Sequence, residues 1–182
     1  TTSIGDVWGT GLMVPGHGFL LNDELTDFNA VPRFAAGPDG HDPGADDVAP
    51  FKRPRSSMAP TIIFLDGEPV AAHGSPGGGT IINTVLNVTL ALIDHGATLR
   101  QSVLAPRISL IGASDTEPAH FEPGIDTQVR KQLSALGYIL RPQDAIGAVQ
   151  AILTIPWSGE QYGAADPRRI GGVAAADAPK NP

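Results

Sequence analysis

Two polar loops near the middle of the chain carry groups that could bind and polarise a carbonyl substrate. Ser56 and Ser57 form a hydroxyl pair, and hydroxyls donate hydrogen bonds to carboxylates. Gly77 and Gly78 lie in the glycine-rich segment 74–79, where backbone N–H groups can approach a ligand because no Cβ blocks them. Taken singly, each loop is more often an exposed polar segment or a tight turn than a site. Together they offer the donors that stabilise an anionic or partly negative oxygen.

A β-hairpin is predicted between these two loops. The apolar runs 62–65 and 69–73 are joined by Asp66-Gly67-Glu68, and Asp-Gly between two such runs is a strong hairpin signal. The hairpin would hold the two loops close together. The apolar segment 80–94 follows, and we predict a helix that is buried between layers. The N-terminus of that helix would add to the anion-stabilising character of the glycine-rich loop.

Composition and charge indicate a globular protein and exclude several functions. Hydrophobic residues make up 41% of the 182 residues and charged residues 17%, which favours one folded domain, 1–182, over a disordered chain. The net charge is -7 and the only basic run is 52–55, so no nucleic-acid partner is expected. There is no cysteine, which excludes disulfides and thiolate metal sites. The apolar stretch 81–93 contains Asn83 and Asn87, which indicates a core helix and no membrane association.

The sequence gives no sign of a metal site or of a serine-hydrolase motif. The five histidines are scattered without the spacing of metal ligands. His41 stands among aspartates in the loop 29–51, where an exposed acidic loop is the better interpretation. Ser75 is followed by Pro76 and has no evident base beside it, and His73, inside the predicted hairpin, is expected to be structural. From these residues we therefore expect no metal site.

The remaining patterns predict a mixed α+β architecture, in which helices cover sheet faces. Thr98 and Gln101 fit a capping box, and Pro106 ends the helix that they begin. Asp126 is a candidate N-cap for a helix that Gly137 ends. The expected strands are 11–14, 18–21, 107–111, 138–140 and 148–155, and residues 171–182 are expected to form a loose tail.

An acidic segment and the first residue are further candidates for chemistry. Glu24 and Asp27, in the segment 22–27, could receive a substrate ammonium, although an exposed loop is the commoner meaning of such a segment. An N-terminal threonine such as Thr1 can serve as nucleophile and base together, because its Oγ attacks a carbonyl and its α-amine accepts the proton. Thr1 is also merely the first residue of this sequence, so the residues alone leave both interpretations open.

Motifs spread over nearly the whole chain occur in a fixed order. The central ones are Arg53-Pro54, Ser56-Ser57-Met58, Pro60-Thr61 and Gly74-Ser75-Pro76-Gly77-Gly78. The flanking ones are Gly9-Thr10-Gly11, Gly18-Phe19-Leu20-Leu21-Asn22, Glu24, Asp27-Phe28, Ala105-Pro106-Arg107 and Tyr162-Gly163-Ala164-Ala165-Asp166-Pro167-Arg168. In combination they resemble the small subunit of γ-glutamyltranspeptidases, which are N-terminal-nucleophile hydrolases made by self-cleavage of a precursor.

This resemblance implies a fold, a partner and a reaction. The fold is the small-subunit portion of an αββα sandwich, completed by a large subunit from the same precursor. Glu24 and Asp27 bind the α-amino group of a γ-glutamyl substrate, and Ser56 and Ser57 bind its α-carboxylate. The backbone N–H groups of the Gly77-Gly78 pair stabilise the tetrahedral oxyanion. A threonyl ester forms, and water or an amino acid then takes the acyl group without a cofactor. The family also favours a periplasmic or extracellular location.

The resemblance also bears on the nucleophile. In the family, the nucleophilic threonine starts a strand–turn–strand segment before the Gly-Thr-Gly motif, whereas here Gly9 follows Thr1 by only eight residues. It therefore implies an N-terminal hairpin and a nucleophile upstream of this sequence, with Thr1 as the candidate that the sequence itself holds. Ser3 takes the place of a second threonine that hydrogen-bonds the nucleophile. Gly5 takes the place of a polar side chain that contacts the substrate.

Two alternatives follow from the same residues. One is an acylase of the same family that acts on glutaryl or cephalosporin-type amides. A glutaryl group has no amine, so Glu24 and Asp27 would be left without a partner, which is costly. The other is a catalytically incomplete fragment or homologue, for which Gly5 and the short N-terminal segment are the evidence.

Overall fold

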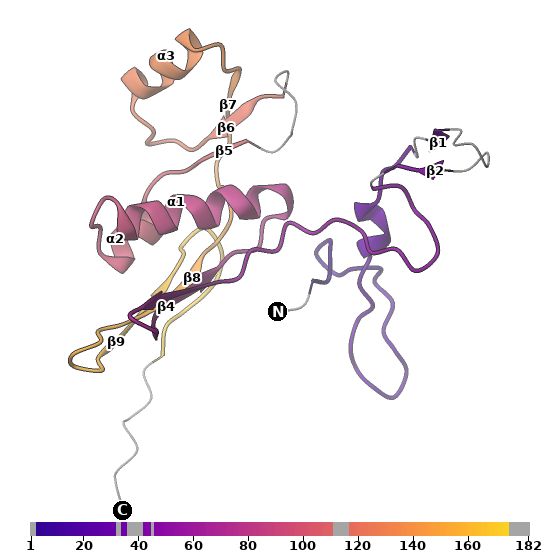
Figure 1. The fold of residues 1–182 in the computed structure, drawn as a ribbon, viewed down its shortest axis with the longest axis horizontal. Helices are drawn as coiled ribbons and strands as arrows, with labels where there is room; N and C mark the ends of the chain where they lie inside the picture. The colour runs from indigo at the N-terminus through magenta and orange to yellow at the C-terminus, as the bar shows by residue number, and fades with distance from the viewer. Residues whose placement is uncertain (1–2, 32–33, 36–41, 45, 111–116, 175–182) are drawn as a thin grey trace, which may run out of the picture. The chain divides into compact units, whose positions relative to one another are not determined.

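The computed structural model describes residues 3–31, 34–35, 42–44, 46–110 and 117–174 (Figure 1). The chain divides into two compact units, Thr1–Ser56 and Ser57–Pro182, and each is described by itself. Among the described residues, the C-terminal unit contains two sheets and three α-helices, and the N-terminal unit contains mainly turns. Within the described ranges, no helix has the length and apolar character needed to span a bilayer.

A four-stranded antiparallel sheet is the centre of the C-terminal unit. Its order is β3 (Thr61–Leu65), β4 (Glu68–Gly74), β8 (Gln150–Thr154) and β9 (Gln161–Ala165). The predicted hairpin is confirmed as β3 and β4, which pair from Thr61↔His73 to Leu65↔Glu68. Its two turn residues, Asp66 and Gly67, both have positive φ (52° and 89°), as the favoured two-residue hairpin turns require.

Two helices cover one face of this sheet. These are α1 (Ile81–Ile93) and α2 (Leu99–Leu104), and α2 begins with the predicted capping box of Thr98 and Gln101. Figure 1 shows both helices running across the sheet. The apolar core between the layers consists of Val88, Leu99, Val103, Val149 and Ala164. This cluster joins residues from both helices with Val149, just before β8, and with Ala164 in β9.

The helix α1 was correctly predicted, but its expected burial on most sides is wrong for the described residues. Only Thr84, Val85 and Val88 are buried. Asn83 and Asn87 face another side of the helix and donate to the carbonyls of Leu110 and Ile108. A third side, with Ile82, Leu86 and Ile93, is 49–59% exposed. Apolar composition predicts that a surface will be covered, but it does not say whether the same chain covers it.

A second, three-stranded sheet lies on the other side of α1 from the first (Figure 1). Its strands are β5 (Ile108–Leu110), β6 (Ala119–Phe121) and β7 (Leu140–Pro142). The pair β5–β6 is antiparallel and the pair β6–β7 is parallel, with α3 (Thr127–Ala135) as the crossover. Asp126 caps α3 as predicted, since its carboxylate accepts the N–H of Gln128 at 2.6 Å. The strand expected at 138–140 is displaced to 140–142 by the turn that ends α3.

The N-terminal unit has less regular structure than the sequence predicts. The expected strands 11–14 and 18–21 reduce to one isolated bridge, Met13↔Leu20, because no third strand among the described residues extends the pair. The other elements are the 3₁₀ helix η1 (Glu24–Asp27) and the short pair β1 (Phe34–Ala35) and β2 (Asp42–Pro43). His41 and Asp39 lie outside the described residues. Among the described residues, no group of three histidine, aspartate or glutamate side chains could hold a metal ion.

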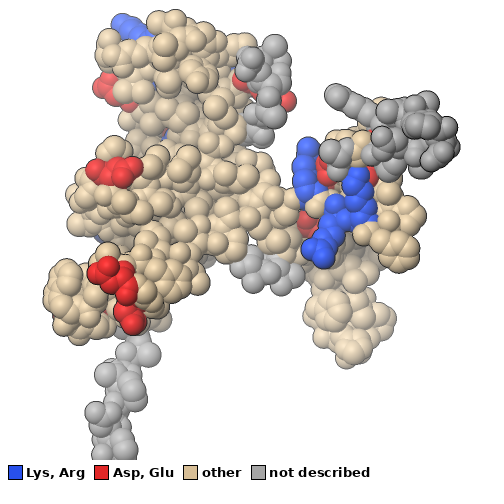
Figure 2. Space-filling view, in the orientation of Figure 1, with Lys and Arg blue, Asp and Glu red and all other residues tan. Residues whose placement is uncertain are grey.

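The basic run of the N-terminal unit lies on one face of that unit (Figure 2). Two of its side chains have partners within the unit. Lys52 donates to the carbonyl of Gly44 at 2.6 Å, and Arg55 pairs with Asp46 at 3.6 Å. Asp47, which is fully buried, accepts the amide of Asn29 and the N–H of Gly44. These aspartates therefore organise the loop in which they lie.

A cluster of four charged side chains joins the two sheets and α2, and we call it the charge cluster. Its members are Arg107, Glu122, Asp166 and Arg168. Arg107 donates to Asp166 at 2.7 Å, and Arg168 donates to Glu122 at 2.5 and 2.6 Å. Arg107 and Asp166 are 1% exposed and Glu122 is 3% exposed. Two positive and two negative charges therefore neutralise one another where little solvent reaches, since the fourth side chain, Arg168, is 13% exposed.

The charge cluster favours the ionised form of Asp166. Burial alone would raise the pKa of Asp166. Hydrogen bonds from the backbone N–H groups of Arg168 and Val149 and from the Arg107 guanidinium outweigh burial and hold this pKa below its ordinary value.

We expect Asp166→Asn to destabilise the protein strongly. The substitution leaves the buried Arg107 guanidinium and the partly exposed Arg168 guanidinium facing Glu122 alone. Breaking a buried ion pair from one side costs about 3–5 kcal/mol. Urea unfolding of the complete protein at neutral pH measures the loss. The matched control is Arg55→Met, which breaks an ion pair whose arginine is 70% exposed, and exposed pairs contribute about 0–1 kcal/mol. A loss for Asp166→Asn no larger than that for Arg55→Met would show that the charge cluster is not a stability determinant.

Candidate functional site

The segment 74–80, which we call the glycine turn, connects β4 to α1. Gly77 has φ 147° and Gly78 has φ 54°, and side-chain-bearing residues rarely adopt either value. A Cβ on Gly77 would also lie 2.5 Å from Thr80 Oγ1. Gly78–Thr80 forms the 3₁₀ turn η2, which continues into α1. The glycine turn is therefore the N-terminal end of a helix, where backbone N–H groups carry a partial positive charge.

The N–H groups of Gly77 and Gly78 are available as donors. Among the described residues, neither has a hydrogen-bond acceptor. The carbonyl of Gly77 is engaged instead, because it accepts from both the N–H and the hydroxyl of Thr80 at 3.1 and 2.9 Å. Two adjacent free donors at a helix N-terminus can stabilise an oxyanion.

The segment 57–60, which contains Ser57, enters the sheet at the same end from which the glycine turn leaves it. Thr61 at the start of β3 pairs with His73 near the end of β4, and a Cβ on Gly74 would lie 3.9 Å from Pro60 Cα. The predicted hairpin thus brings Pro60 and the start of the glycine turn to one end of the sheet. Ser57 is half-buried and Ser56 is exposed.

The acidic residues occupy one turn of the N-terminal unit. Glu24 and Asp27 are the first and last residues of η1. Residues three apart in a 3₁₀ helix lie on the same face. Both are half-buried, and the hydroxyl of Ser3 donates to the Glu24 carboxylate. The structure therefore brings three of the predicted site residues together.

Asp23 is a residue of this region that the sequence did not single out. Its carboxylate accepts the N–H of Asp6 at 3.1 and 3.3 Å. It also fills the space that a Cβ on Gly5 would occupy, so this arrangement requires glycine at position 5. The sequence carries no local signal for the contact, because it joins residues that are far apart along the chain.

The predicted site residues divide between the two units. Ser57, Gly77 and Gly78 belong to the C-terminal unit, and Ser3, Glu24, Asp27 and Ser56 to the N-terminal unit. That all of them line one cleft therefore stays a prediction. Thr1, the candidate nucleophile, lies outside the described residues.

His73 is packed between β4 and α1, in the structural role expected of it. It is 6% exposed, and its Nε2 lies 2.9 Å from Thr89 Oγ1. Burial lowers its pKa, a shift partly opposed by a hydrogen bond with the backbone of Val85, so the ring is neutral at neutral pH.

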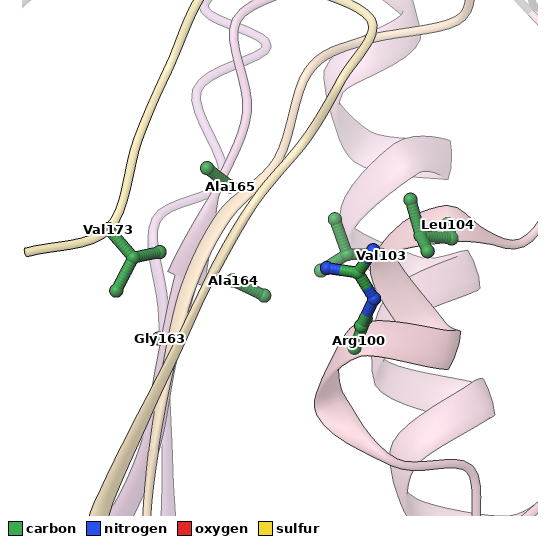
Figure 3. A pocket seen from close by; sticks show the side chains of 7 residues that line it. All are labelled: Arg100, Val103, Leu104, Gly163, Ala164, Ala165 and Val173. Carbon is green, nitrogen blue, oxygen red and sulfur yellow. The ribbon is translucent and has the colours of Figure 1, made fainter.

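The C-terminal unit also has a surface pocket that does not include the glycine turn. It has a volume of about 330 Å³ and lies between α2 and β9, with Arg100, Val103 and Leu104 on one side and residues 163–165 and Val173 on the other (Figure 3). None of the predicted site residues lines it. The glycine turn, and not this pocket, is the candidate site in the C-terminal unit.

Comparison with known proteins agrees with the sequence motifs. A family model described as Gamma-glutamyltranspeptidase matches residues 1–176. The chain is 42% identical over 173 residues to a glutathione hydrolase proenzyme of Bacillus subtilis, covering 94% of this chain and 27% of the relative. It is 37% identical over 177 residues to the Escherichia coli glutathione hydrolase proenzyme, covering 96% and 30%. The chain thus spans roughly a quarter to a third of the length of these relatives.

Solved structures confirm the predicted α+β fold of N-terminal-nucleophile hydrolases. A mutant of Helicobacter pylori gamma-glutamyltranspeptidase is similar with a TM-score of 0.79 and 34% identity, covering 93% of this chain and 91% of that chain. The enzyme from Pseudomonas nitroreducens in complex with L-DON gives a TM-score of 0.79 and 30% identity, covering 97% and 91%. A cephalosporin acylase from Bacillus halodurans, at 23% identity and a TM-score of 0.73, shares the fold.

Proposed function

The chain belongs to the gamma-glutamyltranspeptidase family, and from this premise we propose that it is the part of a γ-glutamyl acyl-transfer enzyme that binds the glutamyl group and stabilises its oxyanion. The observation that carries the proposal is the glycine turn. It presents two adjacent N–H groups without acceptors among the described residues, at the start of α1. Relatives named glutathione hydrolase proenzymes support glutathione and related γ-glutamyl amides as the substrate class.

In the proposed reaction, a threonine hydroxyl attacks the γ-carbonyl carbon of the substrate. Thr1 is the candidate that this sequence holds. The hydroxyl proton passes to the free α-amine, which has an ordinary pKa of about 7.7–8.0 and can accept it at neutral pH. The carbonyl oxygen becomes an oxyanion, and the N–H groups of Gly77 and Gly78 stabilise it. The C–N bond then breaks, and the departing amine takes the proton.

The γ-glutamyl ester that remains is transferred to water or to the amine of an acceptor. Glu24 and Asp27 hold the α-ammonium of the glutamyl group throughout, and Ser56 and Ser57 hold its α-carboxylate. A carboxylate facing an ammonium forms a charge-assisted hydrogen bond, which orients the substrate as well as binding it. No step of this reaction requires a metal or an organic cofactor.

The partner in this proposal is the large subunit of the same precursor. The relatives are proenzymes of which the chain covers 24–32%. One face of the four-stranded sheet packs against α1 and α2, whereas the opposite face carries Ile62 and Ile152, 59% and 41% exposed, on either side of Ala72. A large subunit that supplies a second sheet would cover these side chains and complete the αββα sandwich.

We expect Ile152→Asp to prevent assembly with the rest of the precursor. An aspartate there would be buried without a partner when a second sheet packs on this face. The matched control is Val129→Asp on α3, because Val129 and Ile152 are both 41% exposed in this chain. Co-purification of the tagged chain with the co-expressed remainder of the precursor measures assembly. Loss of assembly with Val129→Asp but not with Ile152→Asp would assign the interface to another face.

The complete protein should hydrolyse a γ-glutamyl anilide, and the 182-residue chain alone should not. The isolated chain would lack the partner subunit that completes the pocket. Release of the aniline, followed by absorbance, measures turnover, and intact mass shows how the precursor is cleaved. A complete, cleaved protein with no γ-glutamyl turnover would refute the proposed function. Turnover by the isolated chain, lost when its α-amine is blocked, would show instead that Thr1 is a sufficient nucleophile.

Asp27→Asn in the complete enzyme should weaken γ-glutamyl hydrolysis at least tenfold in kcat/KM. The change keeps the shape but removes a charge-assisted hydrogen bond, which contributes about 1.5–3 kcal/mol, and about 1.4 kcal/mol corresponds to tenfold. The loss should appear mainly in KM, and it should shrink for a glutaryl amide, which has no ammonium. Equal losses on both substrates would make Asp27 structural and would favour the acylase alternative.

A further inference from the structure

The two donor groups of the glycine turn lie in peptide units whose carbonyls are already held. The N–H of Gly77 belongs to the same planar unit as the carbonyl of Pro76, and the N–H of Gly78 to the same unit as the carbonyl of Gly77. In a trans peptide the N–H and C=O point in opposite directions, and no described peptide bond is cis. Whatever fixes each carbonyl therefore also aims the donor on the other side of the same unit.

Ser75 fixes the first of these carbonyls. Its hydroxyl donates to Pro76 O at 2.7 Å and accepts the N–H of Ala148 at 2.8 Å. A serine hydroxyl has one proton to donate, and the bond from Ala148 occupies an acceptor site and leaves that proton for Pro76. Thr80 fixes the second carbonyl, that of Gly77, through its N–H and its hydroxyl.

The segment 146–149, which we call the support loop, presses against the glycine turn. A Cβ on Gly147 would lie 2.7 Å from Ser75 Oγ and 2.7 Å from Thr84 Oγ1. Gly147 has φ 66°, so its backbone also favours glycine. Thr84 is fully buried, so the contact leaves little room for Ser75 to move.

The charge cluster holds the support loop in turn. Ile146 donates its N–H to Glu122 at 2.7 Å and accepts from Arg107 at 2.8 Å through its carbonyl. Val149 donates its N–H to Asp166 at 2.9 Å. The N–H of Ala148, which binds Ser75, thus lies between two anchored residues that are 0% exposed.

We propose that Ser75 is a positioning residue that aims the Gly77 N–H at the oxyanion, that Thr80 does the same for Gly78, and that the support loop sets Ser75. This inference rests on the proposed function of the glycine turn. It gives Ser75 a role other than that of nucleophile, because its proton is committed to Pro76 and its oxygen accepts from Ala148.

The test compares Ser75→Ala with the wild type in the complete, cleaved protein. The variant removes the hydroxyl that holds Pro76 O, so the Gly77 donor loses its fixed direction. Losing one oxyanion donor lowers the rate by about 10²–10³. A donor that is present but misdirected should lower kcat by a smaller factor, of at least about tenfold. KM and the affinity for the product L-glutamate should stay within about threefold, because the donors act on the transition state. Affinity for a boronic acid analogue of the tetrahedral intermediate should fall in parallel with kcat.

A second pair of variants tests Thr80 and guards against a folding defect. Thr80→Val keeps the shape of the side chain but loses the hydroxyl, whereas Thr80→Ser keeps the hydroxyl. Because the N–H of residue 80 still binds Gly77 O in both, Thr80→Val should lower kcat less than Ser75→Ala does, and Thr80→Ser should restore it. Ser102→Ala is the control for loss of a buried hydroxyl, since Ser102 is 2% exposed and its hydroxyl donates to the carbonyl of Thr98, the N-cap of α2. It should leave kcat unchanged.

Crystal structures of the same variants separate this inference from the proposed function. In Ser75→Ala the peptide unit between Pro76 and Gly77 should rotate, and in Ser102→Ala it should not. If the wild type lacks γ-glutamyl turnover, the proposed function fails, and the rotation alone decides whether Ser75 positions the turn. An unrotated peptide in Ser75→Ala, or an unchanged kcat in an active enzyme, would overturn the inference.

Discussion

The charge cluster is the contact on which the C-terminal unit depends. Burying charges costs several kcal/mol for each ion, and mutual attraction offsets this only when the remaining donors and acceptors are also satisfied. Here Arg168 donates to Glu122 and Asp166 and also to the carbonyls of Val103 and Ala105. Apolar side chains of similar volume could supply equal stability. Unlike apolar side chains, the charged side chains also orient the backbone, because each hydrogen bond fixes the backbone group with which it is made.

The charge cluster is linked to the glycine turn by a short series of hydrogen bonds. Glu122, Arg107 and Asp166 fix the support loop, the support loop fixes Ser75, and Ser75 fixes Pro76 O. An oxyanion site acts by being organised before the reaction, so that no reorientation is needed as charge develops. Backbone donors have no rotamers to select. Their direction depends on the peptide planes, and these depend on the surrounding packing.

The parts of the fold that could be predicted from sequence are those set by neighbours along the chain. Asp66-Gly67 predicts the hairpin turn, and Thr98 with Gln101 predicts the start of α2, because each signal acts within one turn. The pairing of β4 with β8 could not be predicted, since Ala72 and Ile152 are joined by no local signal. The open side of α1 was missed for a related reason: apolar residues show that a surface needs a cover but not which chain provides it. The strands expected near Met13 and Leu20 form only a bridge, because alternation alone does not supply a neighbouring strand.

The candidate site shows the same division between local and distant contacts. The glycine turn could be recognised from sequence because most of what it needs lies within seven consecutive residues. Ser75 reaches the carbonyl of the next residue, Pro76 brings no N–H that would need an acceptor, and Thr80 reaches Gly77 O across one 3₁₀ turn. The N–H of Ala148 comes from elsewhere in the chain, and it is a backbone group that carries no sequence signature. Asp23 escaped prediction for the same reason, since its role is to occupy the space that glycine leaves at position 5. The spacing of serine, the glycine pair and threonine thus follows from peptide geometry: each donor lies one peptide bond from the carbonyl that must be held, and each holding group lies within one turn of that carbonyl.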